Sequence, residues 1–378
     1  MKITDVEVLI LEAPGDYAAP SGAEEAYGYK HLVLLRVHTD EGITGVADVE
    51  SQPHVVKAIV EAPQRELFSG LRHLVVGEDP FEIERLWHRM FEGTYYYGRR
   101  GAVLQAISGI DIACWDIMGK ATGRPLYKLL GAGYRDRVRA YASTLFRPTP
   151  EAMAEACRRY LDQGFTAIKF GWGVFGRDPD LDVRLVEAAR RTVGDDVDLL
   201  IDAGWLIHRT PKETIAMIER LEPYRPFWVE EPCHPEDYRG YAAVATAVRT
   251  RIAAGEQEAT VWGFRQLLDE GKVDVVQPDL SRCGGLTIAR TVAHMAAERN
   301  VAVCPHAWLS QILLAASLHY NAFLRDALFI EYSVAEGPLS RALCRTPLEL
   351  EDGYVRVPQG PGLGVALDEA VVAKYRIA

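Results

Sequence analysis

Six polar residues recur at nearly regular intervals through the second half of the 378-residue chain. They are Asp202, Glu230, Glu256, Asp279, His306 and Glu331, and subtraction of neighbouring numbers gives intervals of 28, 26, 23, 27 and 25 residues. Each lies at the end of a short apolar run. One strand with its helix and loops takes about this many residues, since a barrel of roughly 250 residues holds eight such units. The interval therefore predicts that the six side chains lie at the same ends of successive parallel strands.

Short apolar runs alternate with amphipathic helical segments after Val138. The runs are "VRAYAS", "GFTAIKF", "VDLLID", "PFWVEE", "RIAAGE", "VDVVQPD", "VAVCPH" and "LFIEYS". Between them, segments such as "PDLDVRLVEAARRTVG" and "TIARTVAHMAAERN" carry apolar residues three and four apart, which is the helical period. This alternation predicts a parallel α/β barrel. A doubly wound open sheet would need a glycine-rich phosphate-binding turn after its first strand, and the sequence has none there.

The first 125 residues follow a different pattern. The runs in "HLVLLRVHTDEGITGVADV" flank the turn residues Thr39 to Gly42 and predict a strand hairpin. From Phe81 to Gly123 the apolar residues take the helical spacing, and Gly-Arg-Pro ends the second helix. We therefore expect an α+β domain before the barrel.

Composition limits the class of protein and of partner. The formal net charge of -11 argues against nucleic acid or an anionic membrane surface, but not against a small anionic substrate beside a metal. No run approaches the roughly 18 apolar residues of a membrane span, and "MKITDVEVLILEAPGDY" has no cleavage site for a signal peptidase. Six scattered cysteines without a C-x-x-C pair indicate reduced thiols. We expect a cytoplasmic protein.

Three of the strand-end residues, Asp202, Glu230 and Glu256, are carboxylates on successive strands. Where they converge, they would repel one another strongly without a cation. Ligation by oxygen alone favours a hard ion, and Mg²⁺ is the expected cofactor. Because successive strand residues face opposite ways, only one of Glu230 and Glu231 points into the barrel mouth. The other should support the metal ligands or hold the turn before Pro232.

The next two strand ends carry Asp279 and His306. A carboxylate beside an imidazole fixes its tautomer and stabilises its protonated form, which is the arrangement of a general base. We interpret His306 as the catalytic base and Asp279 as its partner.

Lys169 and Glu331 are further candidates for catalysis. In "TAIKFGWG" the alternation of strand residues puts Lys169 on the face of Ala167 and Gly171, toward the barrel mouth. Glu331, on the last strand, is placed to donate or accept a hydrogen bond opposite the metal. An ion pair with an arginine such as Arg282 is an equally good interpretation of Glu331.

Taken together, the ordered motifs resemble the mandelate racemase-like branch of the enolase superfamily. They are "GRRGAVLQAISGIDIACWDIMGK", "LIDAG", "WVEEP", "AAGE", "QPDLSRCGG", "VCPHAW" and "PGLG", and they cover almost the whole chain. The resemblance implies a modified TIM barrel of (β/α)₇β form over residues 126–355, with an N-terminal α+β capping domain over residues 1–125. Residues 356–378 would return to the capping domain.

The resemblance also implies roles for single residues. One Mg²⁺ per active site would be held by Asp202, Glu230 and Glu256, with Glu230 preferred to Glu231 because related strands with one acid have it at the first position. The shared step removes the proton α to a carboxylate and gives an enediolate. Asp279 stands where another branch has lysine, which favours the His–Asp branch.

Substrate choice would depend on loops at about residues 14–30 and 48–56. Candidate contacts to a small carboxylate-bearing substrate are Tyr29, Lys30 and Trp308. A polyhydroxylated mono- or diacid fits the small, acidic and aromatic residues of the first loop.

Two departures from the family pattern bear on the reaction. The second strand reads Lys169-Phe170-Gly171 where many relatives have K-x-K or K-x-H, so Gly171 replaces the second acid–base residue. Racemisation through two bases needs groups on both faces of the planar intermediate. In addition, Gly204 stands where relatives often have asparagine, which removes a substrate contact.

His306 alone can remove the α-proton and then protonate a β-hydroxyl on the same face. This favours an acid-sugar dehydratase, a carbon–oxygen lyase that yields a 2-keto-3-deoxy acid. The alternative reactions, racemisation, epimerisation or cycloisomerisation, share the enediolate. A hydrolase would need histidine ligands such as H-x-H, which the sequence lacks, and a mere binding protein would not need the His–Asp pair. The resemblance also suggests a homo-oligomer.

Overall fold

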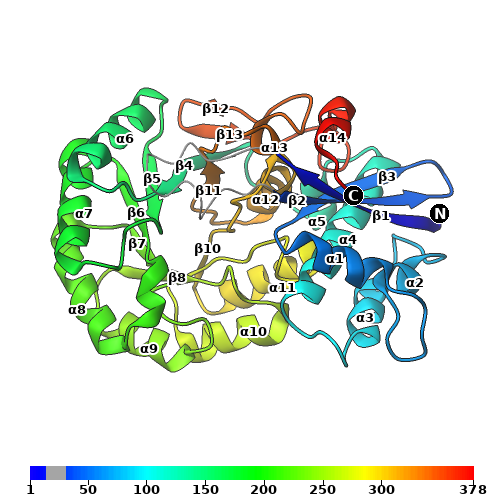
Figure 1. Cartoon of the computed structure of the whole chain (residues 1–378), viewed down its shortest axis with the longest axis horizontal. Coiled ribbons are helices and arrows are strands. Elements are labelled where there is room, and N and C mark those ends of the chain that lie inside the picture. Colours follow the sequence, from blue (N-terminus) through cyan, green and yellow to red (C-terminus); the bar gives the residue numbers. More distant parts are fainter. Residues whose placement is uncertain (14–30) are drawn as a thin grey trace.

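The computed structural model describes residues 1–13 and 31–378. Its N-terminal part contains an antiparallel sheet in the order β1 (Ile3–Glu12), β2 (His31–Thr39) and β3 (Thr44–Val49), so the predicted hairpin is confirmed. The helices beside this sheet are α1 (Pro53–Glu61), α2 (Leu71–Val75), α3 (Ile83–Gly93), α4 (Ala102–Thr122) and α5 (Leu126–Leu130). Figure 1 shows this part at one side of the molecule, next to the larger parallel sheet.

Helix α4 is the central helix of the N-terminal part. By length and hydropathy it would suffice to cross a membrane, but 83% of its most apolar window is buried inside the protein. It packs against β3 on one side and against α11 (Gly285–Glu298) on the other. Gly123 follows in the left-handed conformation and ends it. Its apolar sequence is therefore explained by contact with both parts of the chain.

Eight parallel strands form the larger part, as the sequence predicts. They are β4 (Arg137–Leu145), β5 (Ala167–Gly171), β6 (Asp198–Asp202), β7 (Trp228–Glu230), β8 (Arg251–Ala254), β9 (Val275–Val276), β10 (Ala302–Val303) and β11 (Ile330–Ser333). Neighbours in the chain pair from β4 to β10, and the last strand, β11, pairs back to the first, β4. This wrap-around order with one helix in each interval is the (β/α)₇β arrangement.

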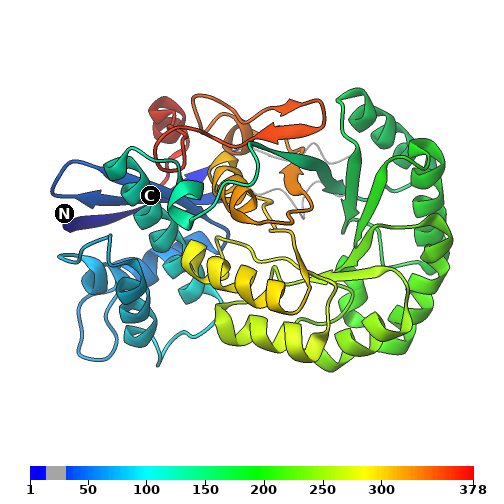
Figure 2. The ribbon, with the colours of Figure 1, turned by 180° about the vertical axis from the view of Figure 1, so that it is seen from behind.

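The helices of this part cover the outside of the strands (Figures 1 and 2). They are α6 (Pro150–Asp162), α7 (Pro179–Val193), α8 (Pro211–Leu221), α9 (Tyr238–Ala247), α10 (Thr260–Gln266), α11 (Gly285–Glu298) and α12 (Gln311–Phe323), with short turns η1 (Gly204–His208), η2 (Glu222–Tyr224) and η3 (Leu267–Gly271). Proline begins each of α6, α7 and α8, after the capping residues Thr149, Asp178 and Thr210. A polar cap followed by proline is a strong start signal. The cap side chain accepts a hydrogen bond from a first-turn amide that has no partner within the helix, and proline has no amide hydrogen that would need one.

The interior of the barrel contains a layer of mostly apolar side chains. It takes one residue from each strand or its immediate flank: Tyr141, Ala167, Leu200, Trp228, Ala253, Val275, Cys304 and Phe329. Side chains from all strands therefore meet at one level and fill the barrel. This layer is the floor on which the next level of side chains rests.

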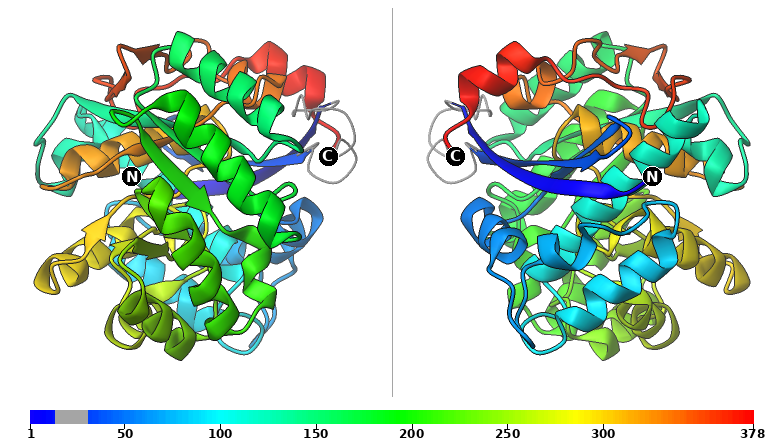
Figure 3. Two further views of the ribbon diagram at one scale, coloured as in Figure 1. Left: turned by 90° about the vertical axis from the view of Figure 1, so that its left-hand side faces the viewer. Right: turned by 90° about the vertical axis from the view of Figure 1, so that its right-hand side faces the viewer.

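The C-terminal residues return to the N-terminal sheet. After α13 (Pro338–Arg341), the hairpin of β12 (Leu350–Glu351) and β13 (Tyr354–Arg356) pairs with the start of β4, and α14 (Glu369–Tyr375) follows. Ala378 accepts a hydrogen bond of 2.8 Å from the amide of Ile10. Figure 3 shows the C-terminus beside β1. The C-terminal segment thus contacts both parts of the chain, the barrel through β13 and the N-terminal sheet through Ala378.

Candidate active site

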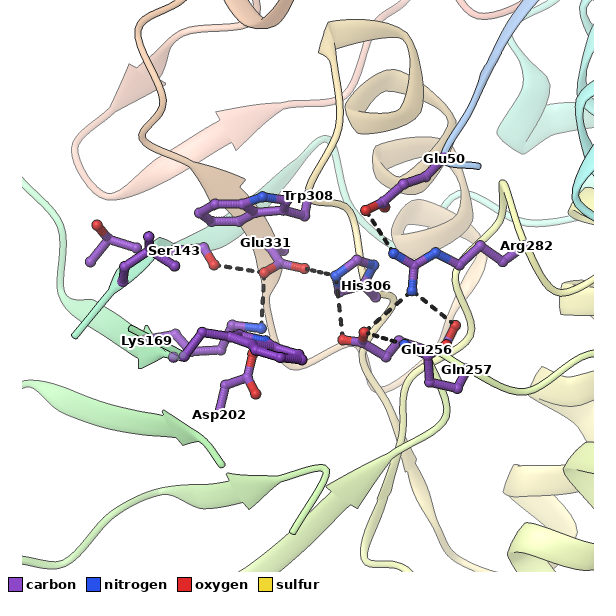
Figure 4. Close-up of a pocket in the computed structure, with 14 residues that line it drawn as sticks. Glu50, Ser143, Lys169, Asp202, Glu256, Gln257, Arg282, His306, Trp308 and Glu331 are labelled. Carbon is purple, nitrogen blue, oxygen red and sulfur yellow. Dashed lines mark hydrogen bonds and ion pairs between the residues drawn. The ribbon is translucent and has the colours of Figure 1, made fainter. Parts of the chain in front are cut away.

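A layer of polar side chains lies directly above the apolar floor of the barrel. Two residues further along each strand come Ser143, Lys169, Asp202, Glu230, Gly255, Gln277, His306 and Glu331. Because strand residues alternate, these positions face the same interior. A cavity of about 320 Å³ opens above them at the carboxyl ends of the strands (Figure 4). Barrel enzymes have their active sites at this end.

Three carboxylates in the site are close enough to share a metal ion. Asp202, Glu230 and Glu256 each offer an oxygen within 4.8 Å of the other two, and all three residues are buried. Burial, followed by repulsion from Glu230, raises the pKa of Asp202 well above its usual value. Burial also raises the pKa of Glu230, against the opposing effect of Lys169. The pKa of Glu256 is instead lowered, because His306 and Arg282 outweigh its burial. Three buried carboxylates this close together fit a site whose ligand is a cation.

The second acid of "WVEEP" points away from this group. Glu231 has a positive φ of 46°, and its carboxylate accepts hydrogen bonds from the amide of Gly255 at 2.9 Å and the hydroxyl of Tyr241 at 3.2 Å. Burial raises its pKa to about 8. Glu231 therefore ties the turn after β7 to the turn after β8, while Glu230 faces the cavity floor.

Lys169 and Glu331 form a buried ion pair on one wall of the cavity. The Lys169 Nζ lies 2.9 Å from Glu331 Oε1 and 2.6 Å from Glu230 Oε1. Burial alone would lower the pKa of Lys169, but Glu230 and Glu331 outweigh it and raise the pKa well above its usual value. The reverse holds for Glu331, where Lys169 and His306 outweigh burial and lower the pKa to about 2. Both groups are therefore charged at neutral pH.

Glu331 acts only as an acceptor, because it is ionised. Its two oxygens accept hydrogen bonds from the Ser143 hydroxyl at 2.7 Å and the Ala307 amide at 2.8 Å. Glu331 thus makes both kinds of contact that the sequence suggested, hydrogen bonds and an ion pair, but the cation of the pair is Lys169 and not Arg282.

His306 and Asp279 form the opposite wall. The Nδ1 of His306 lies 2.6 Å from Asp279 Oδ2, and Asp279 also accepts hydrogen bonds from the amide and hydroxyl of Ser281. Nε2 lies on the cavity side of the ring, 3.4 Å from Glu256 and 3.8 Å from Glu331. Burial lowers the pKa of His306, but Glu256 and Glu331 outweigh it, so the pKa is raised well above its usual value. With Nδ1 held by Asp279, Nε2 is the nitrogen of His306 that faces the cavity.

Arg282 connects this wall to the N-terminal part of the chain. Its guanidinium lies 2.7 Å from Glu50, which follows β3, 3.2 Å from Glu256 and 3.7 Å from Asp279. Glu50, Asp279 and His306 are also close enough to hold an ion. The second group includes an imidazole nitrogen, whereas the first offers oxygen alone, so the first group suits a hard ion better.

Gly171 has no room for a side chain. A Cβ built there would lie 2.7 Å from Oδ2 of Asp202. Its neighbour Trp172 has a positive φ of 52° and lines the cavity. Gly204, the other departure from the family pattern, has a positive φ of 45° and donates its amide to Asp202 at 3.2 Å. Gly171 thus leaves room for the Asp202 side chain, and the Gly204 amide holds the same carboxylate.

The structure brings most of the predicted site residues into this cavity. Trp308 lines it together with the charged residues (Figure 4), whereas Tyr29 and Lys30 lie outside the described residues. Sequence reasoning missed Ser143, Glu50 and Gln277. The first and last follow from counting two residues on from the apolar floor. Glu50 lies within the predicted loop at about residues 48–56, but nothing in the sequence indicates its contact with Arg282.

Two family models match the chain. The model described as mandelate racemase / muconate lactonizing enzyme, N-terminal domain, matches residues 6–131. The model described as enolase C-terminal domain-like matches residues 152–371. Together they cover the N-terminal sheet and helices and nearly the whole barrel.

Characterised relatives align over the same length. The chain is 33% identical to D-galactarolactone cycloisomerase of Agrobacterium fabrum, over 100% of this chain and 99% of that protein. It is 36% identical to D-galactonate dehydratase of Ralstonia pickettii, over 90% of each. The crystal structure of a racemase from Streptomyces coelicolor with bound magnesium superposes with a TM-score of 0.86 at 29% identity, over 99% of this chain and 100% of that one. The fold predicted from the sequence is confirmed.

Proposed function

Because the chain belongs to the mandelate racemase and muconate lactonizing enzyme family of the enolase superfamily, we propose that it is an acid-sugar dehydratase. It removes the proton α to the carboxylate and then expels the β-hydroxyl as water, which gives a 2-keto-3-deoxy acid. The observation that carries this proposal is the His306–Asp279 pair, which faces a wall where the described residues offer no second free base.

We assign Mg²⁺ to Asp202, Glu230 and Glu256. Their close, buried oxygens and the absence of nitrogen or sulfur from the group suit a hard divalent ion. When bound, Mg²⁺ would supply positive charge beside the substrate carboxylate, where negative charge develops as the α-proton leaves.

His306 is the proton carrier of the proposed reaction. With Nδ1 donating to Asp279, Nε2 is the atom that accepts the α-proton. The C–H electron pair moves into the carboxylate. The same Nε2–H then protonates the β-hydroxyl as the C–O bond breaks, so water departs from the face on which the proton was removed. The remaining enol takes up its keto form.

Lys169 acts as a fixed charge in this proposal. Its two carboxylate partners keep it protonated, so it cannot accept the α-proton. It instead stabilises the negative charge of the enediolate, and Glu331 holds it in place. Trp308, on the same cavity, is the proposed contact to the sugar chain, together with Tyr29 and Lys30.

Cycloisomerisation of a sugar-acid lactone is the second candidate function. The alignment with D-galactarolactone cycloisomerase over the whole chain favours it. The proton path is the same, but the leaving group is the ring oxygen of the lactone. The product is then an open-chain keto acid with a second carboxylate.

Proton NMR in D₂O with Mg²⁺ tests both functions on a panel of aldonic acids, aldaric acids and their lactones. A 2-keto-3-deoxy acid from a hydroxy acid supports dehydration, and ring opening without loss of water supports cycloisomerisation. Exchange of the α-proton with inversion and no elimination would contradict both, since it needs a second base.

A further inference from the structure

Gln277 is a buried amide in the polar layer that the proposed reaction does not use. It is 1% exposed. Within the described part of the chain, neither its amide nitrogen nor its amide oxygen has a hydrogen-bond partner. Buried amides are nearly always paired, because an unpaired polar group costs free energy when it leaves water. The side chain therefore calls for a partner outside the polypeptide.

The position of Gln277 shows where that partner would lie. Val275 belongs to the apolar floor, and Gln277 follows two residues later, directly after the end of β9 and beside Glu230. Its backbone amide donates to Ala254 at 2.9 Å, which fixes it beside the strand that leads to Glu256. On its other side, β10 leads to His306.

The amide lies close to Glu230. After burial and the nearby charges, it is a smaller cause that lowers the pKa of the Glu230 carboxyl. The contact between the two side chains does not have hydrogen-bond geometry. Both oxygens of Glu230 already accept hydrogen bonds, from Lys169 at 2.6 Å and from the indole of Trp228 at 3.1 Å. Gln277 thus lies beside the carboxylates, but Glu230 does not need it as a hydrogen-bond donor.

An amide offers a donor and an acceptor together. Water matches this pair, whereas a bare cation matches only the acceptor. Mg²⁺ releases its water reluctantly and usually keeps several molecules when it binds to carboxylates. A hydrated Mg²⁺ on the three acids would bring such water to this part of the layer.

We propose that Gln277 is a positioning residue of the metal centre, with its amide hydrogen-bonded to water that Mg²⁺ carries into the site. The inference rests on the proposed metal ligands. It makes Gln277 a determinant of metal affinity and not of protein stability.

Calorimetric titration of the metal-free protein with Mg²⁺ tests this role directly. Gln277→Met keeps nearly the same volume and removes both polar atoms. We expect it to weaken Mg²⁺ binding about 10- to 100-fold, the usual effect of losing such a supporting partner. In thermal unfolding without Mg²⁺, the variant should be at least as stable as the wild type, because an unpaired buried amide is gone.

Asn321 provides a matched control. It is also buried with an unpaired amide oxygen, but it lies on α12, away from the metal ligands. Asn321→Leu should leave Mg²⁺ binding unchanged. An equal loss of affinity in both variants would overturn the role of Gln277, and so would wild-type affinity in Gln277→Met.

The two proposals fail in different ways. If the wild type binds no Mg²⁺, the metal site and Gln277's role in it are both wrong. If the wild type binds Mg²⁺ and Gln277→Met binds it equally well, only the role of Gln277 is wrong. Should Gln277→Met not fold, Gln277→Asn keeps the amide but withdraws it by one methylene, and wild-type Mg²⁺ affinity in that variant would also refute the proposal.

Discussion

The two walls of the cavity differ in what their side chains can do with a proton. On the wall formed by β5 and β11, Lys169 is fixed between Glu230 and Glu331, and Gly171 has no side chain. On the other wall, Asp279 holds His306 so that Nε2 lies toward the cavity. Figure 4 shows Lys169 and His306 on opposite sides of Glu331.

This difference assigns one function to each wall. A lysine with two carboxylate partners keeps its proton, whereas an imidazole with one tethered nitrogen exchanges a proton at the other. In the proposed reaction, proton transfer therefore takes place on one face of the substrate, and the described residues of the opposite wall supply only charge. Elimination on one face follows from this arrangement, whereas inversion at carbon does not.

Removing the proton carrier should have the largest effect. His306→Asn is expected to lower kcat/KM by about 10³-fold or more, within the range of general acid–base catalysis. Exchange of the α-proton with D₂O should fall by the same factor, as measured by proton NMR. Asp279→Asn serves as the comparison and should retain more activity, since it disturbs only the orientation of the ring. Undiminished exchange in His306→Asn would place the base on the other wall.

Removing the fixed charge should affect stability as well as rate. Lys169→Met leaves Glu230 and Glu331 buried without their cation, and loss of one partner of a buried ion pair costs about 3–5 kcal/mol. Urea unfolding of the metal-free protein measures this loss. Mg²⁺ should restore part of it, because a cation returns beside Glu230. Full stability without metal would show that Lys169 does not hold these acids.

Filling the space at Gly171 tests why the lysine wall has no second base. Gly171→Ala places a methyl group against Asp202, so this carboxylate must move. We expect Mg²⁺ affinity to fall about tenfold, at the lower end of the range for disturbed metal sites. Gly171→Lys should weaken binding further without creating a racemase. Inversion of configuration by that variant would show that only the missing side chain separates the two reactions.

The fold and the charged core of the site could be predicted from local patterns. Strand-end spacing predicts the positions of Asp202 and Glu230, which are the last residues of β6 and β7, and of His306, which follows β10 by three residues. Alternation along β5 predicts the inward direction of Lys169. These predictions needed only regular backbone geometry.

Contacts between distant segments could not be predicted in this way. The pair of Arg282 and Glu50 joins two parts of the chain whose docking has no sequence signal. Likewise, the competing ion-pair interpretation of Glu331 was right about the contact but could not select Lys169 over Arg282. Which of the two cations pairs with Glu331 depends on which side chain lies at the same level of the barrel, and this is set by tertiary packing and not by local sequence.

A buried carboxyl outside the cavity provides a reference for both walls. Asp111 of α4 accepts hydrogen bonds from the amide and hydroxyl of Thr287 in α11, where the N-terminal part meets the barrel. Burial raises its pKa to about 7. Glu331 is buried as well, but Lys169 and His306 lower its pKa to about 2. The two cations beside Glu331, not the extent of its burial, therefore account for the difference between these two carboxyls.

The reference carboxyl gives the smallest predicted effect, a change in pH dependence. The folded-state pKa of Asp111 lies above its unfolded value of 3.8, so the folded state binds the proton more tightly. Its stabilising contribution is complete below the unfolded pKa and is lost as pH rises through about 7. Asp111→Asn cannot ionise. Its free energy of unfolding should therefore fall less steeply than that of the wild type between these values, by up to about 1 kcal/mol per pH unit. Urea unfolding at a series of pH values measures the difference, and parallel curves for the two proteins would mean that Asp111 is already ionised in the folded protein.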